Sequence, residues 1–230
     1  PSNLVTDVDI ESERQLKESL CEEFPDFGFL GEESGEHGGK TGLRWIVDPV
    51  DGTRNYALGV PHFAVSIALV DRSETFIGVT YDPVRNELFH AIKGGGAFIN
   101  GRRISVSSRT SPEDILLGFD IGVVDNNTKH RLKMVQSLLP SLQAIRIMGS
   151  ATLGFCYVAA GRFDGFWERG LQPWDIAAGI VLVREAGGTI TEIDGGDVMQ
   201  TGSLLAANED LHPLIEKQLR HAAAFARKAD

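Results

Sequence analysis

One segment constrains what this chain can fold into more than any other: residues 45–55, which read WIVDPVDGTRN. The apolar start predicts a strand that ends at Asp48, and Pro49 biases that aspartate towards an extended backbone. Gly52 permits a tight turn, so Asp48 and Asp51 can converge on one point at the end of the strand. The alternative is an ordinary Asp-Pro and Asp-Gly turn with solvated acids.

Two carboxylates in this arrangement suit a hard cation. Mg²⁺ prefers oxygen ligands, which the carboxylates and the backbone carbonyl of Val50 can supply. The backbone N–H groups of Gly52 and Thr53 can bind a phosphate, and the Thr53 hydroxyl can orient a water. The segment therefore predicts a cation site beside a phosphate site.

Three further acidic clusters lie at the edges of apolar elements. They are Asp7 with Asp9 before a predicted helix over residues 11–24, Glu32 with Glu33 after an apolar stretch at residues 27–30, and Asp175 in the first turn of a predicted helix over residues 173–185. Each has an ordinary alternative: a helix cap for Asp9, a solvated loop for Glu32 and a helix-dipole contact for Asp175. Four clusters placed in this way are what a shared multinuclear metal site requires, so together they favour the metal interpretation.

The rest of the chain predicts alternating strands and helices. Strands are expected over residues 43–47, 62–70, 76–81, 87–92, 115–119, 144–148, 163–167, 188–192 and 203–207, and helices over 128–139, 150–160, 173–185 and from 209 onwards. We divide the chain into an α+β half at residues 1–108 and an α/β half at residues 109–230. The two halves are expected to pack tightly and to place a site in the crevice between them.

The net charge of this 230-residue chain limits its partners. A formal charge of -10 argues against binding to nucleic acid or to an anionic membrane, because such a surface repels phosphate groups. No stretch approaches the roughly 18 consecutive apolar residues of a membrane span, and we expect a cytoplasmic location. An acidic chain can hold a phosphate ester only where cations or aimed backbone amides reverse the local charge.

Three motifs resemble the signatures of the inositol monophosphatase family and follow one another in the same order as in that family. They are GEES at residues 31–34, DPVDGT at residues 48–53 and WDIAAG at residues 174–179. The resemblance covers nearly the whole chain, including Thr6-x-x-Asp9 and EAGG at residues 185–188. It implies an αβαβα layered α/β sandwich like that of fructose-1,6-bisphosphatase, Mg²⁺-dependent hydrolysis of small phosphate monoesters with two or three ions per subunit, inhibition by Li⁺, and a homodimer.

The resemblance also implies roles for individual residues. Glu32, Asp48, the Val50 carbonyl and Thr53 would hold a first metal; Asp48, Asp51 and Asp175 a second; and Glu32 with a water-linked Asp9 a weaker third. The amides of Gly52 and Thr53 would bind the phosphate, while Gly149, Ser150, Ala151 and Glu168 would contact the substrate alcohol. Ser150 as an ordinary helix N-cap is the alternative for that residue.

From these residues we expect in-line attack on phosphorus by a metal-activated water that Glu32 and Thr53 orient and deprotonate. Inositol 1-phosphate is the first candidate substrate. The chain departs from the family in two ways. Members usually begin with one or more helices before the Thr-x-x-Asp motif, which this sequence lacks. Arg54 and Tyr56 stand where many members have a small polar residue and Phe, and Arg54 either alters substrate preference or is solvated.

Other functions fit the same motifs. The same chemistry can act on fructose 1,6-bisphosphate, histidinol phosphate or 3′-phosphoadenosine 5′-phosphate. A non-catalytic regulatory protein on this scaffold is a second alternative, although it would be expected to have lost a metal ligand and none is missing. A structural Ca²⁺-binding domain is a third, but it gives no reason for the Gly-Thr amides.

Overall fold

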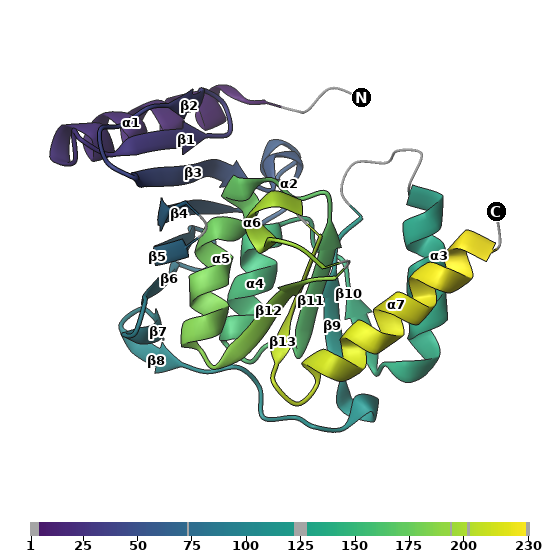
Figure 1. Ribbon diagram of the computed structural model, residues 1–230. Coiled ribbons are helices and arrows are strands. Elements are labelled where there is room, and N and C mark those ends of the chain that lie inside the picture. The colour runs from purple at the N-terminus through teal and green to yellow at the C-terminus, as the bar shows by residue number, and fades with distance from the viewer. Residues whose placement is uncertain (1–4, 73, 122–127, 194, 202, 229–230) are drawn as a thin grey trace.

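The computed structural model describes residues 5–72, 74–121, 128–193, 195–201 and 203–228, which form two β-sheets with helices around and between them (Figure 1). The first sheet has eight strands in the spatial order β2-β1-β3-β4-β5-β6-β7-β8. The second sheet has five strands in the spatial order β10-β9-β11-β13-β12.

The bounds of the elements follow the predicted ones closely in the second half of the chain. The first sheet contains β1 (Gly28–Gly31), β2 (Gly35–His37), β3 (Leu43–Asp51), β4 (Ala64–Asp71), β5 (Glu74–Asp82), β6 (Glu87–Ile92), β7 (Gly96–Ile99) and β8 (Arg102–Ile104). The second contains β9 (Leu116–Phe119), β10 (Ala144–Arg146), β11 (Gly165–Arg169), β12 (Gly188–Glu192) and β13 (Ser203–Asn208). The helices are α1 (Asp7–Glu23), α2 (Thr53–Ala57), α3 (Thr128–Leu138), α4 (Ala151–Ala159), α5 (Pro173–Glu185), α6 (Val198–Thr201) and α7 (His212–Lys228), with short 3₁₀ turns at Pro112–Asp114 and Leu139–Ser141.

The elements stack in five layers. Figure 1 shows α1 outside the first sheet, α4 and α5 between the two sheets, and α3 with α7 outside the second sheet. Helix α5 lies directly on the first sheet because residue 78 of β5 has no side chain: a Cβ at Gly78 would stand 2.6 Å from Ala178 O. The largest group of buried apolar side chains combines residues of the first sheet with residues of α4 and α5. This arrangement confirms the predicted αβαβα sandwich.

Strand β3 lies inside the first sheet, parallel to β1 and antiparallel to β4. The prediction that it ends at Asp48 is wrong, because it continues to Asp51. Asp48 pairs with Ser66 but Asp51 with Ala64, so β3 carries one extra residue there. Side chains three apart on a regular strand point to opposite faces, and an extra residue brings them back to one face. This bulge is therefore what lets the two aspartates converge.

Helix α1 corrects a second prediction. Its N-cap is Thr6, not Asp9, and Asp9 occupies the third helical position. Asp9 Oδ2 accepts a hydrogen bond from Thr6 N at 3.0 Å, while Asp9 N donates to Thr6 Oγ1 at 3.4 Å, which is a reciprocal capping box. Asp9 is fully buried. Leu16 and Leu20 of the same helix pack against a small apolar group centred on Trp45.

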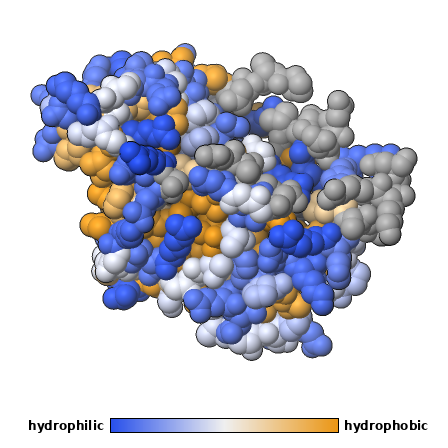
Figure 2. Space-filling model, in the orientation of Figure 1, coloured by the Kyte–Doolittle hydropathy of each residue, from blue (hydrophilic) through white to orange (hydrophobic). Residues whose placement is uncertain are grey.

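Hydrophilic residues cover much of the face shown in Figure 2, including α1 at the upper left, and hydrophobic residues show through below it. Among the described residues, no helix combines the length and the apolar character that a membrane crossing needs.

Candidate metal and phosphate site

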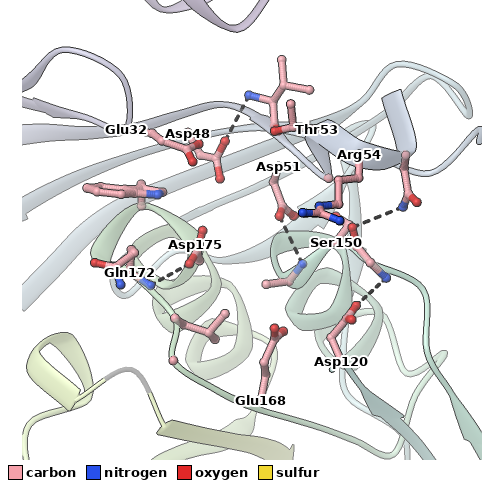
Figure 3. Close-up of a pocket in the computed structure, with 18 of the residues that line it drawn as sticks. Glu32, Asp48, Asp51, Thr53, Arg54, Asp120, Ser150, Glu168, Gln172 and Asp175 are labelled. Atoms are coloured by element: carbon pink, nitrogen blue, oxygen red, sulfur yellow. Dashed lines mark hydrogen bonds between the residues drawn. The ribbon is translucent and has the colours of Figure 1, made fainter. Parts of the chain in front are cut away.

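Three aspartates from two elements meet in a pocket (Figure 3). Asp48 and Asp51 come from the bulged end of β3, and Asp175 from the first turn of α5. One carboxylate oxygen from each lies within 4.8 Å of the others. Pro173 occupies the first turn of α5 as predicted, and Asp175 Oδ2 accepts a hydrogen bond from Gln172 N at 2.6 Å, which fixes the orientation of this carboxylate. We call these three residues the aspartate wall.

The aspartate wall carries strong mutual repulsion. Burial raises the pKa of Asp48 well above its ordinary value, and the charges of Asp51, Asp175 and Glu32 raise it further. Burial, followed by the charge of Asp51, raises the pKa of Asp175 to about 8. A divalent cation offsets such repulsion, and a set made only of oxygen ligands suits Mg²⁺ or another hard ion. The residues present therefore fit the expected metal.

Asp51 differs from Asp48 and Asp175 because residues at the start of α4 donate several hydrogen bonds to its carboxylate. Its Oδ2 accepts hydrogen bonds from Ser150 Oγ, from Thr152 N at 2.8 Å and from Thr152 Oγ1 at 2.6 Å. Its Oδ1 accepts a longer one from Ala151 N at 3.3 Å. Burial raises the pKa of Asp51, and these hydrogen bonds lower it. Ser150 is also the N-cap of α4, as expected, through Leu153 N.

The turn after β3 places Thr53 at the pocket. Gly52 has a φ of 92°, a conformation that favours glycine. Thr53 Oγ1 lies 3.1 Å from Asp9 Oδ1 and 3.0 Å from Val50 O, so its single proton can be donated to only one of them at a time. The Thr53 oxygen then keeps a lone pair for another donor. Asp9 does not itself line the pocket and reaches it through Thr53.

Glu32 enters the pocket from the loop after β1, where its backbone N–H donates to Val47 O at 3.2 Å. A buried carboxylate of α1 supports this loop from behind. Glu13 Oε2 accepts a hydrogen bond from Glu33 N at 2.8 Å, and Glu13 Oε1 accepts one from Ser34 N at 2.7 Å. Glu13 is only 2% exposed. The two residues that follow Glu32 are therefore tied to α1.

The opposite side of the pocket, which we call the Glu168 wall, is formed by Glu168 and Asp120 (Figure 3). Glu168 is 7% exposed and points into the pocket in Figure 3, and its Oε2 has no hydrogen-bond partner in the described structure. Burial raises its pKa well above the ordinary value, the charge of Asp120 raises it further, and the charge of Arg131 lowers it. Asp120 Oδ2 accepts a hydrogen bond from Gly149 N, which fixes the loop before α4.

The pocket has a volume of about 540 Å³. The residues predicted for metal and substrate that line it are Glu32, Asp48, Val50, Asp51, Gly52, Thr53, Gly149, Ser150, Ala151, Glu168 and Asp175. Asp9 is the exception among the predicted residues. The prediction missed Glu13, Asp120 and Arg131, which carry no motif. Only the position of Asp120 at the end of a predicted strand, over residues 115–119, gives a signal in the sequence.

Comparison with known proteins agrees with this geometry. Residues 1–224 match the model of a family described as the inositol monophosphatase family. The chain is 44% identical over 224 residues to an inositol-1-monophosphatase of Rhizobium meliloti, with 96% of this chain and 84% of the relative covered. It is 44% identical over 211 residues to the Nus factor SuhB of Pseudomonas aeruginosa, with 89% and 78% covered. The crystal structure of the extragenic suppressor protein suhB of Bartonella henselae superimposes with a TM-score of 0.92 at 42% identity, covering 96% of this chain and 86% of that one.

Proposed function

The chain belongs to the inositol monophosphatase family, whose members hydrolyse phosphate monoesters, and we propose that it converts inositol 1-phosphate to inositol and phosphate in a Mg²⁺-dependent reaction. One observation carries the proposal: the carboxylates of Asp48, Asp51 and Asp175 lie within 4.8 Å of one another beside the Gly52-Thr53 turn. The similarity to a protein named inositol-1-monophosphatase supports the choice of substrate.

The family resemblance implies the proposed metal ligands, and all of them except Asp9 line the pocket. Glu32, Asp48, the Val50 carbonyl and Thr53 would hold one ion; Asp48, Asp51 and Asp175 a second; and Glu32 with a water-linked Asp9 a third. Bound Mg²⁺ supplies the positive charge that neutralises the phosphate and makes a water more acidic. Asp51 offers mainly its Oδ1 to an ion, because three hydrogen bonds already occupy Oδ2.

The residues of this chain would act on the water and on the ester. When Thr53 donates its hydrogen bond to Asp9, its oxygen can accept a hydrogen bond from a water that Glu32 also orients, and Glu32 would take the proton of that water. That water gives up one proton as it attacks phosphorus in line, the bond from phosphorus to the alcohol oxygen breaks, and the alcohol oxygen takes up one proton from solvent water in exchange. The backbone N–H groups of Gly52 and Thr53 donate to the phosphate oxygens during this displacement. No covalent phosphoenzyme is needed.

The Glu168 wall would bind the alcohol. The unpartnered Glu168 Oε2 is a buried acceptor, and a hydroxyl group of inositol is a matching donor. Gly149, Ser150 and Ala151 would form the side of this subsite, although the Ser150 hydroxyl already donates to Asp51. Hydroxyl-rich alcohols therefore fit this wall better than apolar ones.

The finer properties of the protein belong to the same proposal. We expect a homodimer that Li⁺ inhibits, as the family resemblance implies, and a cytoplasmic location. Leu58, Val60 and Ile147 are 80%, 43% and 50% exposed, and they lie on two loops that Asn55 joins through its hydrogen bond to Met148 O. These apolar side chains support an interface between two copies, which sedimentation velocity can test.

The non-catalytic alternative rests on the relatives named Nus factor SuhB. Phosphate release from inositol 1-phosphate, fructose 1,6-bisphosphate, histidinol phosphate and 3′-phosphoadenosine 5′-phosphate, each with Mg²⁺ or with excess EDTA, decides between the two functions. Mg²⁺-dependent release from inositol 1-phosphate is expected. Release from another ester alone would reassign the substrate, and silence of the folded protein across all four would favour the regulatory function.

A further inference from the structure

Arg54 lines the same pocket as the aspartate wall. Its side chain extends over the pocket near Asp51 and Ser150 in Figure 3. The backbone at this point is fixed by the next residue, because Asn55 Nδ2 donates to Met148 O at 2.8 Å and so ties α2 to the loop before α4. The backbone that carries the Arg54 side chain is therefore held in place at the pocket.

The Arg54 guanidinium makes no hydrogen bond or ion pair with any residue that the structure describes. Other arginines beside carboxylates are paired: Arg109 with Asp164 at 2.8 Å, and Arg162 with Glu87 at 2.6 Å. In a chain with a formal charge of -10, a cationic group over a pocket lined by carboxylates would be expected to find such a partner. Arg54 is thus a charged donor that remains available to a ligand.

The reason that Asp51 does not pair with Arg54 is visible in its contacts. Ser150 and Thr152 give Asp51 Oδ2 three hydrogen bonds, and Ala151 N approaches Oδ1. The start of α4 therefore meets the need of this carboxylate for donors, and what remains of Oδ1 faces the proposed metal position. Arg54 is left to act on whatever enters the pocket.

The chemistry of Arg54 and of Glu168 indicates which chemical groups a ligand of this pocket should carry. A guanidinium presents five N–H donors in a planar fork that matches a phosphate or carboxylate group. Glu168 Oε2, across the pocket, is an acceptor that matches a hydroxyl group. A hydroxyl at Arg54 would use one or two of its donors and leave its charge without a counterion.

We propose that Arg54 is a specificity-determining residue that binds a second anionic group of the substrate. The preferred substrates are then polyol phosphates that carry an additional phosphate or carboxylate. This inference rests on the phosphatase function proposed above and extends its substrates beyond inositol 1-phosphate, which has no second anionic group.

Three matched esters test the inference. Glucitol 6-phosphate, 6-phosphogluconate and glucitol 1,6-bisphosphate share one six-carbon chain and differ at carbon 1, which bears a hydroxyl, a carboxylate or a phosphate. Inositol 1-phosphate serves as the reference for the proposed function. The kcat/KM of each is measured at constant free Mg²⁺ for the unmodified protein, for Arg54→Gln and Arg54→Lys, and for Arg102→Gln, which removes an exposed arginine of β8 away from the pocket.

The unmodified protein is expected to prefer the two esters with a second anion by about 10-fold, the size of one charge-assisted contact. Arg54→Gln should abolish that preference, lowering kcat/KM for the two esters with a second anion about 10-fold more than for glucitol 6-phosphate, and Arg54→Lys should keep part of it, because lysine retains the charge without the fork. Arg102→Gln should change nothing. High salt should weaken the preference. Preference for only the carboxylate or only the bisphosphate would still support the inference and would identify the anion.

Two outcomes contradict the inference in different ways. Suppose that the protein hydrolyses inositol 1-phosphate but that Arg54→Gln changes kcat/KM equally for all four esters, or for none of them. Arg54 then does not bind a second anionic group, and the proposed function stands. If no ester releases phosphate in the presence of Mg²⁺, the proposed function fails, and the inference fails with it. Melting curves of the variants show whether each one is folded.

Discussion

Asp51 and Asp175 on one side of the pocket differ from Glu168 on the other side in how their buried carboxylates are hydrogen-bonded. On the aspartate wall, Asp51 accepts hydrogen bonds at both of its oxygens, and Asp175 is bound to the backbone of Gln172. On the Glu168 wall, Glu168 Oε2 has no hydrogen-bond partner in the described structure. A carboxylate that the protein has already oriented is suited to hold an ion in a fixed place, whereas a buried acceptor without a donor gains most from a ligand that brings one.

This difference predicts a division of labour that kinetics can detect. Changes on the aspartate wall should lower the rate of the chemical step for every ester, because all esters would use the same ions. Changes on the Glu168 wall should alter binding, and only for alcohols that present a hydroxyl to it.

The largest effect is expected from Asp175→Asn. Asparagine can still accept the hydrogen bond from Gln172 N, but it removes a charged metal ligand. We expect kcat to fall by about 1,000-fold, at the upper end of the losses seen when one stabilising group of a transition state is removed. Asp26→Asn, on an exposed ion pair with Lys40, is the matched control and should be active. Near-normal turnover by Asp175→Asn would show that this residue holds no essential ion.

The second prediction concerns pH in the absence of metal. The pKa of Asp175 rises from 3.8 to about 8 in the folded protein, so the folded state keeps a proton that the unfolded state releases between these values. The contribution of Asp175 to the free energy of unfolding in EDTA therefore falls as the pH rises from about 4 to about 8, by up to roughly 1.4 kcal/mol per pH unit.

Melting temperatures in EDTA at pH 5 and pH 8 measure this effect. Asp175→Asn should gain stability relative to the unmodified protein as the pH rises, and Mg²⁺ at pH 8 should stabilise the unmodified protein more than the variant. Parallel pH dependences of the two proteins would mean that burial and the charge of Asp51 do not raise the pKa of Asp175.

A smaller effect is expected on the other wall, from Glu168→Gln. Glutamine keeps the size of the side chain but replaces one acceptor oxygen with a donor, so a substrate hydroxyl loses its partner. The KM for inositol 1-phosphate should rise about 10-fold with kcat nearly unchanged, which corresponds to the loss of one hydrogen bond. The KM for phenyl phosphate, which has no further hydroxyl, should move little. A large fall in kcat for both esters would erase the distinction between the two walls.

The smallest effect tests the support behind Glu32. In the unmodified protein the two oxygens of Glu13 accept hydrogen bonds from two backbone N–H groups. Glu13→Gln leaves only one acceptor oxygen for these two donors, so the loop that carries Glu32 should become less firmly held. The Mg²⁺ concentration for half-maximal activity should rise roughly 3-fold to 10-fold, with a matching loss of the thermal stabilisation by Mg²⁺. Glu18→Gln, on the exposed face of the same helix, should leave both unchanged. Equal effects of the two variants would assign Glu13 a role in general stability only.

The sequence predicted the elements whose apolar pattern is long and bounded by turn residues. Strand β6 and helix α5 have the predicted bounds. The acidic motifs also predicted that Asp48 and Asp175 belong to one site. The bulge in β3 could not be predicted, because it is defined by the pairing of β3 with β4. The residues of β3 alone do not show which residues of β4 they pair with. Short strands such as β7 and β8 have too few residues to show a period.

The parts of the site that were missed are those without a local signal. Glu13 reads as one more charge on an amphipathic helix, and its burial depends on the backbone of residues 33 and 34 packing over it. For Asp9 the local pattern allows both a helix cap and a site residue; Thr6 is the N-cap, and Asp9 contacts Thr53. Both contacts are set by tertiary packing, which no local pattern contains.

Anomalous diffraction from crystals of the protein grown with Mn²⁺ tests the central claim most directly, because Mn²⁺ takes the oxygen ligands that Mg²⁺ prefers and is visible in such data. We predict anomalous peaks between the carboxylates of Asp48, Asp51 and Asp175, with metal to oxygen distances of about 2.0–2.3 Å. No peak at these three aspartates, in crystals of protein that hydrolyses inositol 1-phosphate with Mn²⁺, would contradict the account.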